Sequence, residues 1–163
     1  YQGAEGRIGR VLAVRLAPGC DLVGSIREIA QKHGVKSGFI MGACSLRKVT
    51  LRNPVSFPDP WPMKEENRTY TTLEQPMELT SMAGNIGHKE NGELVVHLHA
   101  NISLGSPDGV SMGGHIIEGA EIFSTGEIVI MEAEGMDIKR VLNDETKAWE
   151  FWPVERGEGH FQV

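Results

Sequence analysis

Cysteine is scarce in this sequence. Only Cys20 and Cys44 occur among its 163 residues, and they form no CxxC pair. Two isolated cysteines provide no disulfide framework, so a small secreted domain held together by several disulfides is not indicated. We expect both to be reduced thiols with buried or half-buried side chains.

Long apolar runs are also missing. The longest ones span a few residues, far fewer than the ~18 that cross a bilayer, and no basic start followed by an apolar block marks a signal peptide in the printed residues. We therefore expect a cytoplasmic protein with no membrane partner. The chain begins at Tyr1 rather than at a methionine, so this expectation covers the printed residues only.

Positive charge is limited. The chain has 16 lysines and arginines against 22 aspartates and glutamates, for a net charge of −6. Nothing here provides a diffuse positive field for a polyanion. The basic stretches at 47–52 and 138–140 are short and are interpreted as a solvated strand face or a helix end.

What is present is the composition of one globular domain. Hydrophobic residues make up 40% of the chain and charged residues 23%, and 20 glycines indicate many turns. A chain of 163 residues fits one domain that buries roughly two thirds of its unfolded surface. We expect a single domain over residues 1–163, with its core over about residues 8–152.

The first part of the chain predicts a β-α-β unit. The stretch RIGRVLAVRLAPG has strand character until Pro18 and Gly19 end it. A helix follows, with Asp21 as its N-cap, apolar residues at three- and four-residue spacing, and Gly34 at its end. The segments VKSGFIMGACS and LRKVTLRN then resemble strands again.

Proline and turn residues divide the rest of the chain. Residues 53–66 contain four of the eight prolines, which excludes a helix or a central strand. We expect a surface loop anchored by Phe57, Trp61 and Met63, or alternatively a lid over a site. From Thr69 on, strand patterns recur between turns such as ENGE and SPDG, the stretch VSMGGHIIEGAEIF (110–123) among them. The predicted fold class is α+β, a mostly antiparallel, strongly twisted sheet or partly open barrel with one main helix.

Three histidines gather in the stretch VVHLHANISLGSPDGVSMGGHIIEG, residues 95–119. Every second position from 94 to 104 is apolar, whereas His97 and His99 fall between apolar positions. Successive strand side chains point to opposite faces, so these two share the face away from the core. They are predicted to point toward solvent, a pocket or a neighbouring subunit.

This arrangement predicts half of a metal site. Histidines at i and i+2 of a strand are about 7 Å apart at their backbones, so both rings can reach one cation. His115 is the candidate third ligand, because a hairpin would return its strand beside the first. Gly113 and Gly114 would permit a close approach or a bulge there. Three histidines with an open fourth position are the ligand set of a catalytic zinc site.

Two alternatives remain open on spacing alone. An HxH pair on a strand also occurs without any function. A cupin-like barrel would contain the same pair, but its first motif has a glutamate where this chain has Ser103.

From about residue 11 to 151 the sequence resembles the PPC (plants and prokaryotes conserved) domain family. The matching segments are VRLAPGCDLVGSIREIAQKHGVKSGFIMGACS, ELTSMAGNIG, GELVVHLHANISLGSPDGVSMGGHIIEGA and EIVIMEAEG. The resemblance implies a homotrimer with an α+β sheet fold. It also implies a metal, usually taken as zinc, on three histidines whose positions match His97, His99 and His115. The DNA contact of the plant members belongs to their AT-hook, which is absent here, so direct nucleic-acid binding is not expected.

Two functional hypotheses follow. The first is a small cytosolic metal-binding protein that binds or acts on an unidentified small molecule; as an enzyme it would be a metal-dependent hydrolase or lyase. Arg15 is a candidate for binding an anionic substrate. Glu118 is a candidate general base, although its position in the strand places it on the opposite side from His115.

The second hypothesis is a non-enzymatic DNA-associated or regulatory assembly module in which the metal is structural. The segment KAWEFWPVE would then supply a partner-facing patch of Trp149, Phe151 and Trp152. Packing of these aromatic side chains on their own domain is the other interpretation.

Overall fold

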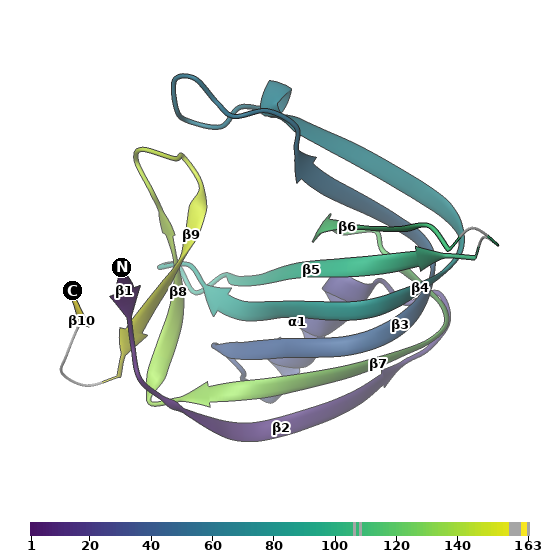
Figure 1. The fold of residues 1–163 in the computed structure, drawn as a ribbon. Helices are drawn as coiled ribbons and strands as arrows, with labels where there is room; N and C mark the ends of the chain where they lie inside the picture. The colour runs from purple at the N-terminus through teal and green to yellow at the C-terminus, as the bar shows by residue number, and fades with distance from the viewer. Residues whose placement is uncertain (106, 108, 157–160, 163) are drawn as a thin grey trace.

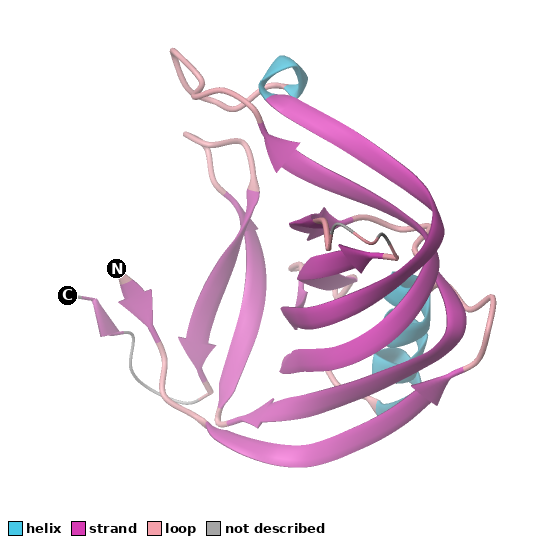
Figure 2. Ribbon diagram, turned by 45° about the vertical axis from the view of Figure 1, so that its right-hand side comes forward, coloured by secondary structure: helices cyan, strands magenta, loops and turns pink. Residues whose placement is uncertain are grey.

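Most of the chain forms one bent β-sheet with a helix against one face (Figure 1; Figure 2). The computed structural model describes residues 1–105, 107, 109–156 and 161–162. The elements are β1 (Gln2–Gly3), β2 (Arg7–Leu16), α1 (Leu22–His33), β3 (Gly38–Pro54), the 3-10 helix η1 (Glu65–Asn67), β4 (Arg68–His88), β5 (Leu94–Leu104), β6 (Ser111–Ile116), β7 (Glu121–Glu134), β8 (Met136–Leu142), β9 (Trp149–Glu155) and β10 (Phe161–Gln162).

The helix α1 begins and ends where its sequence predicts. The Oδ1 atom of Asp21 accepts a hydrogen bond from the Gly24 N–H at 2.6 Å, which satisfies a donor that the first turn leaves free. At the other end, Gly34 has a φ of 68°, a left-handed conformation that glycine adopts at low cost. No helix in the described part of the chain is long and apolar enough to cross a membrane.

Two long strands organise the sheet. β3 and β4 pair antiparallel along almost their whole length, and the strand order is β2-β7-β3-β6-β5-β4-β8-β9. β6 pairs with β5 on one side and with Leu51 and Arg52 of β3 on the other. Strands β3, β4, β5 and β6 therefore close a small circuit, while the order stays open at β2 and β9. This confirms the predicted α+β fold with a mostly antiparallel sheet and one main helix, and the parallel β4–β8 contact makes the sheet mixed.

The hydrophobic core lies between α1 and the sheet face that the helix covers. Along β5, Val96, Leu98 and Ile102 are buried, as the two-residue period predicts. On the helix, Ile26 and Ala30 are fully buried. The other face of β5 is free of the helix, and it carries the polar side chains of the strand.

Two predicted segments differ from the structure. The stretch 110–123 is not one strand, because the chain leaves the sheet between β6 and β7 and Gly119 adopts a φ of 93° there. The proline-rich segment is a loop at the tip of the β3–β4 hairpin, at the top of Figure 1. The predicted surface loop is therefore present. Of its three predicted anchors, Phe57 is 97% exposed and Trp61 57% exposed, whereas Met63 is half-buried.

Candidate metal centre

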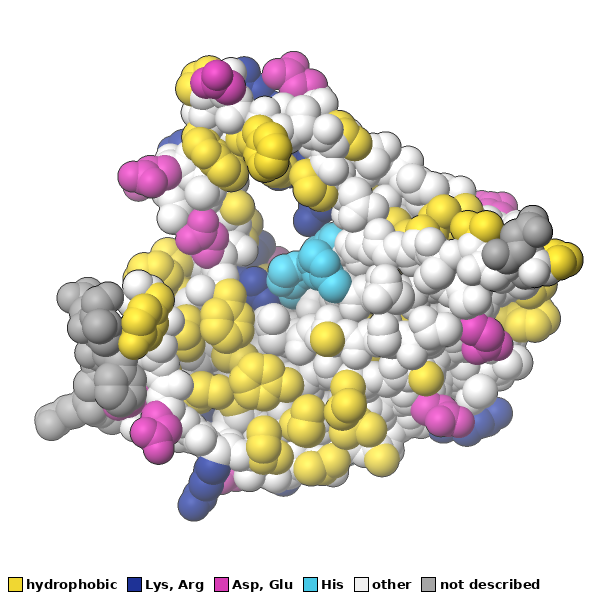
Figure 3. Space-filling view, in the orientation of Figure 1, with side chains coloured by type: hydrophobic (Ala, Val, Ile, Leu, Met, Phe, Trp, Pro, Cys, Tyr) yellow, Lys and Arg dark blue, Asp and Glu magenta, His cyan; other side chains and the backbone are white. Residues whose placement is uncertain are grey.

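Strand alternation places His97 and His99 on the sheet face opposite α1. Leu98 between them is fully buried, whereas His97 is half-buried and His99 is exposed. Figure 3 shows a group of histidine side chains on the open face of the molecule, beside a hollow. The predicted orientation of both residues is confirmed.

The strand β6 brings His115 beside His99. The two residues are direct cross-strand partners, and the β5–β6 register runs without a bulge. The glycines at 113 and 114 instead let the β6 backbone lie close to two asparagine side chains. A side-chain carbon at Gly113 would overlap Asn101, and one at Gly114 would overlap Asn53. The predicted position of His115 beside the first histidine strand is confirmed. A bulge or a close approach was predicted at the two glycines, and the structure shows the close approach.

The three imidazoles are close enough to hold one metal ion. One ligand atom from each of His97, His99 and His115 lies within 4.8 Å of the others, and the Nε2 atoms of His97 and His99 are 3.1 Å apart. Nitrogen ligands at about 2.0–2.1 Å from a tetrahedral zinc ion would be roughly 3.3 Å apart. The nitrogen donor set therefore suits a zinc-type ion. The His97–His99 pair is already near the required spacing, and the whole set lies within 4.8 Å.

Burial and nearby positive charge keep these imidazoles neutral. Burial is the main cause that lowers the pKa of His97 to about 4 and the pKa of His115 to about 3. The charge of Arg140 contributes next at His97, and the charge of Arg52 next at His115. Burial and then Arg52 also lower the pKa of His99. Neutral imidazoles offer a lone pair at pH 7, so protons do not compete with a metal ion there.

Arg140 of β8 is a buried cation beside the histidines. It is 4% exposed, and its Nη2 atom donates to Oδ1 of Asn85, which is the cross-strand partner of His97. Its Nε atom is buried without a hydrogen-bond partner among the described residues. Sequence reasoning took residues 138–140 as a solvated segment and missed this arginine. The available signal was its two-residue spacing from Ile138, which is fully buried on the same strand face.

Arg52 is the second cation at the cluster that sequence reasoning missed. It lies in β3 as the cross-strand partner of His115, and its side chain is half-buried. Neither Arg52 nor Arg140 takes part in an ion pair within the described parts of the chain. Two guanidinium groups thus lie near the histidines without an ion-pair partner among the described residues, although the charge of Arg52 also reaches Glu65.

The structure does not bring the two other candidate residues to the histidines. Glu118 pairs with Arg27 of α1, and the helix covers the opposite face of the sheet, so Glu118 is not placed to act as a base at this cluster. Arg15 lies on β2 opposite Glu127, in a hollow of about 690 Å³ that Met41 also lines and that contains none of the three histidines.

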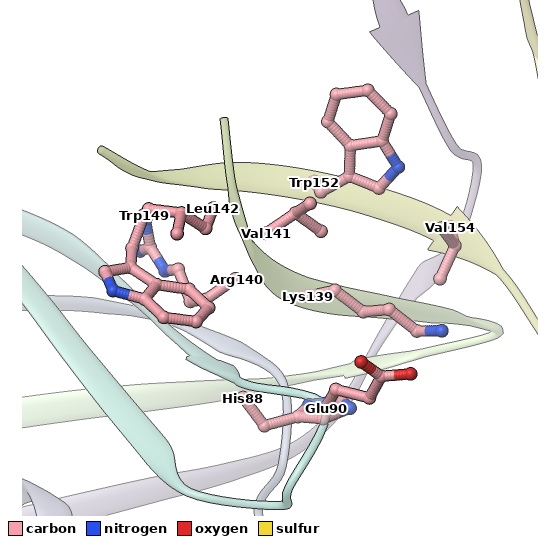
Figure 4. Close-up of a pocket in the computed structure, with 9 residues that line it drawn as sticks. All are labelled: His88, Glu90, Lys139, Arg140, Val141, Leu142, Trp149, Trp152 and Val154. Atoms are coloured by element: carbon pink, nitrogen blue, oxygen red, sulfur yellow. The ribbon is translucent and has the colours of Figure 1, made fainter. Parts of the chain in front are cut away.

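Two hollows lie near the site. His99 lines one of them, whereas the other is lined by Arg140 and by none of the three histidines. One of about 490 Å³ is bounded by His99, Asn53 and Asn101 with small neighbouring residues. The other, of about 620 Å³, lies along the β8–β9 hairpin, where Trp149 and Arg140 are among its lining residues (Figure 4).

The aromatic side chains of β9 pack only partly on their own domain. Trp149 is 48% exposed, Phe151 41% and Trp152 38%. Lys89 places its Nζ atom 4.8 Å from the centre of the Trp149 ring, and the guanidinium carbon of Arg140 is 6.0 Å from the centre of the Phe151 ring. The aromatic patch predicted at residues 147–155 is therefore present at the surface.

Comparison with protein families and curated proteins gives two findings. A family model described as the Plants and Prokaryotes Conserved (PCC) domain matches residues 3–134, a range that contains all three histidines. The bifunctional protein GlmU of Synechococcus sp. (strain JA-3-3Ab) is 29% identical over 125 residues, which are 76% of this chain and 17% of the relative. The chain therefore spans about a sixth of the length of that curated relative.

Solved structures share the fold over nearly the whole chain. A plant- and prokaryote-conserved (PPC) protein from Pyrococcus horikoshii has a TM-score of 0.74 at 27% identity, covering 91% of this chain and 96% of that one. A metal-containing protein from Archaeoglobus fulgidus has a TM-score of 0.74 at 23% identity, covering 90% and 96%. A candidate DNA-binding protein from Bacteroides thetaiotaomicron has a TM-score of 0.69 at 20% identity, covering 92% and 97%. At these last two identities the likeness shows the fold alone.

Proposed function

The chain belongs to the Plants and Prokaryotes Conserved domain family, and from this premise we propose that it binds one zinc-type divalent ion and uses it on a small-molecule ligand. The proposed ligands are His97, His99 and His115. The observation that carries the proposal is the convergence of three neutral imidazoles, each with one ligand atom within 4.8 Å of the others. No fourth histidine, cysteine or carboxylate joins this group among the described residues. Three protein ligands with one open position are typical of catalytic rather than structural zinc.

The surroundings of the cluster favour a ligand that enters from solvent. A zinc-type ion would supply Lewis acidity there, which serves hydrolase or lyase chemistry. His99 is exposed and borders a hollow of about 490 Å³, so a small molecule can reach the cluster from that side. His97 and His115 are held on adjacent strands of the closed circuit, which keeps the imidazoles in place without the ion.

We also propose that the protein is a homotrimer in the cytosol. The histidine face carries exposed apolar side chains, with Val11 58% exposed and Met41 51% exposed, and hydrophobic side chains spread below the histidines in Figure 3. Copies of the chain that cover this face would bury that surface. The two free cysteines, one of them buried, agree with a reducing compartment.

The second candidate function is a non-enzymatic regulatory assembly module with a structural metal, DNA-associated through its partners. The observation that favours it is the exposed aromatic patch of Trp149, Phe151 and Trp152, because aromatic residues are enriched in protein interfaces. The net charge of −6 argues against direct contact with DNA phosphates.

Metal content tests the proposal directly. Inductively coupled plasma mass spectrometry on untagged wild-type protein should find one zinc-type ion per chain, and His97→Ala and His115→Ala should each lose it. His33→Ala is the matched control, because His33 is exposed at the end of α1 and its loss should leave the metal content unchanged. An equal metal content in all four proteins would reject the assignment.

Chelation separates the two candidate functions. If the metal is catalytic, its removal should leave the sheet folded, since the core lies on the other face. If the melting temperature instead falls by tens of degrees on chelation, the result favours a structural metal over a metal site for small molecules.

A further inference from the structure

The charges nearest to the three histidines are all positive. Arg140 bonds to Asn85 beside His97, and Arg52 stands across from His115. The positive charges of both arginines act on the histidines. No acidic side chain belongs to the cluster in the described part of the chain. A divalent ion on three neutral imidazoles would add two more positive charges to this region.

Arg140 has donors that the protein does not use. A guanidinium group carries five N–H donors, and the described hydrogen bonds give Arg140 one acceptor, Oδ1 of Asn85. The Nε atom is buried with no partner among described residues, although the residue is only 4% exposed. A buried cation without a counter-charge is strongly unfavourable. Such an arginine is typical of a site whose negative charge is supplied by a ligand.

We propose that the ligand of this centre is a small oxyanion, a carboxylate or phosphate group, held by Arg140 and Arg52 next to the three histidines. This inference deepens the proposed function, on which it rests for the role of the metal, by naming the chemical class of the substrate. An oxyanion is attracted by both guanidinium charges and by the charge of the ion, and it offsets part of that positive charge. The planar guanidinium group also matches two oxygens of one carboxylate or phosphate.

The sheet gives the oxyanion a defined place. Asn85 orients the Arg140 guanidinium through its hydrogen bond, and the β3–β6 pairing holds Arg52 beside His115. The two arginines come from different strands and act on the same histidines, so one anion beside the cluster would be attracted by both. The aromatic side chain of Phe151, 6.0 Å from the guanidinium carbon, excludes water from one side of Arg140 and so strengthens its attraction for an anion.

Anion binding is measured separately from metal binding. Phosphate and acetate are titrated into metal-free protein by calorimetry, and into protein loaded with Co²⁺ while its visible absorption is followed. We expect wild-type protein to bind these probes, and Arg140→Gln and Arg52→Gln to bind them on the order of tenfold more weakly with unchanged Co²⁺ content. Arg15→Gln is the matched control, because Arg15 lies on the same sheet but in a hollow that none of the three histidines lines, and it should bind like wild type.

Each outcome decides one part of the inference. Circular dichroism checks the fold of Arg140→Gln, and if that variant does not fold, Arg52→Gln carries the test. Equal anion affinity in wild type and in the folded arginine variants would overturn the proposal. Wild-type protein that holds metal but binds neither probe would also overturn it, since the counter-charge of Arg140 would then come from another copy of the chain. Anion binding by metal-free protein that depends on the arginines supports the oxyanion site even if the metal assignment fails.

Discussion

Leu98 and His97 are neighbours on β5, and their replacement by alanine should have opposite consequences. Leu98 is fully buried under α1, so Leu98→Ala removes packed atoms from the core and should cost about 2–5 kcal/mol of the free energy of unfolding. At about 2–4 °C per kcal/mol for a domain of this size, the melting temperature should fall by roughly 4–20 °C. The bound metal should stay at one ion per chain below the transition.

His97→Ala should lose the metal and leave the metal-free fold nearly intact. The His97 side chain lies on the face without the helix, and its described hydrogen-bonding contact is His99. Removing it should change the free energy of unfolding of metal-free protein by less than about 1 kcal/mol. The small cost follows from the absence of core contacts on that face.

Urea unfolding of both variants in the presence of a chelator, at one protein concentration, measures the two costs side by side. Mass spectrometry of the metal gives the second readout. The separation of faces would be refuted if metal-free His97→Ala lost as much stability as Leu98→Ala. It would also be refuted if folded Leu98→Ala lost its metal.

Other predictions concern particular contacts of the fold. Asp21→Ala should lower the free energy of unfolding by about 1–2 kcal/mol in urea titrations. The Asp21 carboxylate accepts hydrogen bonds from the N–H groups of Gly24 and Gly119 at 2.6 and 2.7 Å, and the variant loses both. Asp144→Ala, at an exposed position, is the control. Gly114→Ala should cost about 1–3 kcal/mol and weaken metal binding in a competition assay, since the new methyl group would overlap Asn53. Burial raises the pKa of the Cys44 thiol to about 11. At pH 8 a thiol reagent should therefore modify Cys44 only as fast as the protein unfolds locally or globally. Fast reaction of both cysteines would contradict this burial. Metal-free protein should lose stability as the pH falls from 6.5 toward 4. In the folded protein the pKa of His97 is about 4 and that of His115 about 3, whereas both have a pKa of 6.5 in the unfolded chain, which therefore takes up protons first. The loss of stability should be smaller in His97→Ala.

Local patterns carried much of the prediction of the fold. The N-cap and the terminal glycine of α1 act over three or four residues, so their signals are complete within a short stretch of sequence. The break at Gly119 was missed because the apolar spacing on either side of it resembles one continuous strand. The exposure of Phe57 and Trp61 was missed for a different reason, since an aromatic residue in a loop does not show which surface, if any, lies within its reach.

The sequence by itself determined which face of β5 carries His97 and His99, because the two-residue period of a strand is a local property. It also indicated His115, through the short connection and the glycine pair before it. Only the tertiary structure decided the rest of the site. Arg140 reaches Asn85 across 55 residues of sequence, and Arg52 meets His115 because β6 returns to the end of β3 and closes the circuit of strands. Such contacts depend on strand register and on the curvature of the whole sheet, which no short segment of sequence encodes.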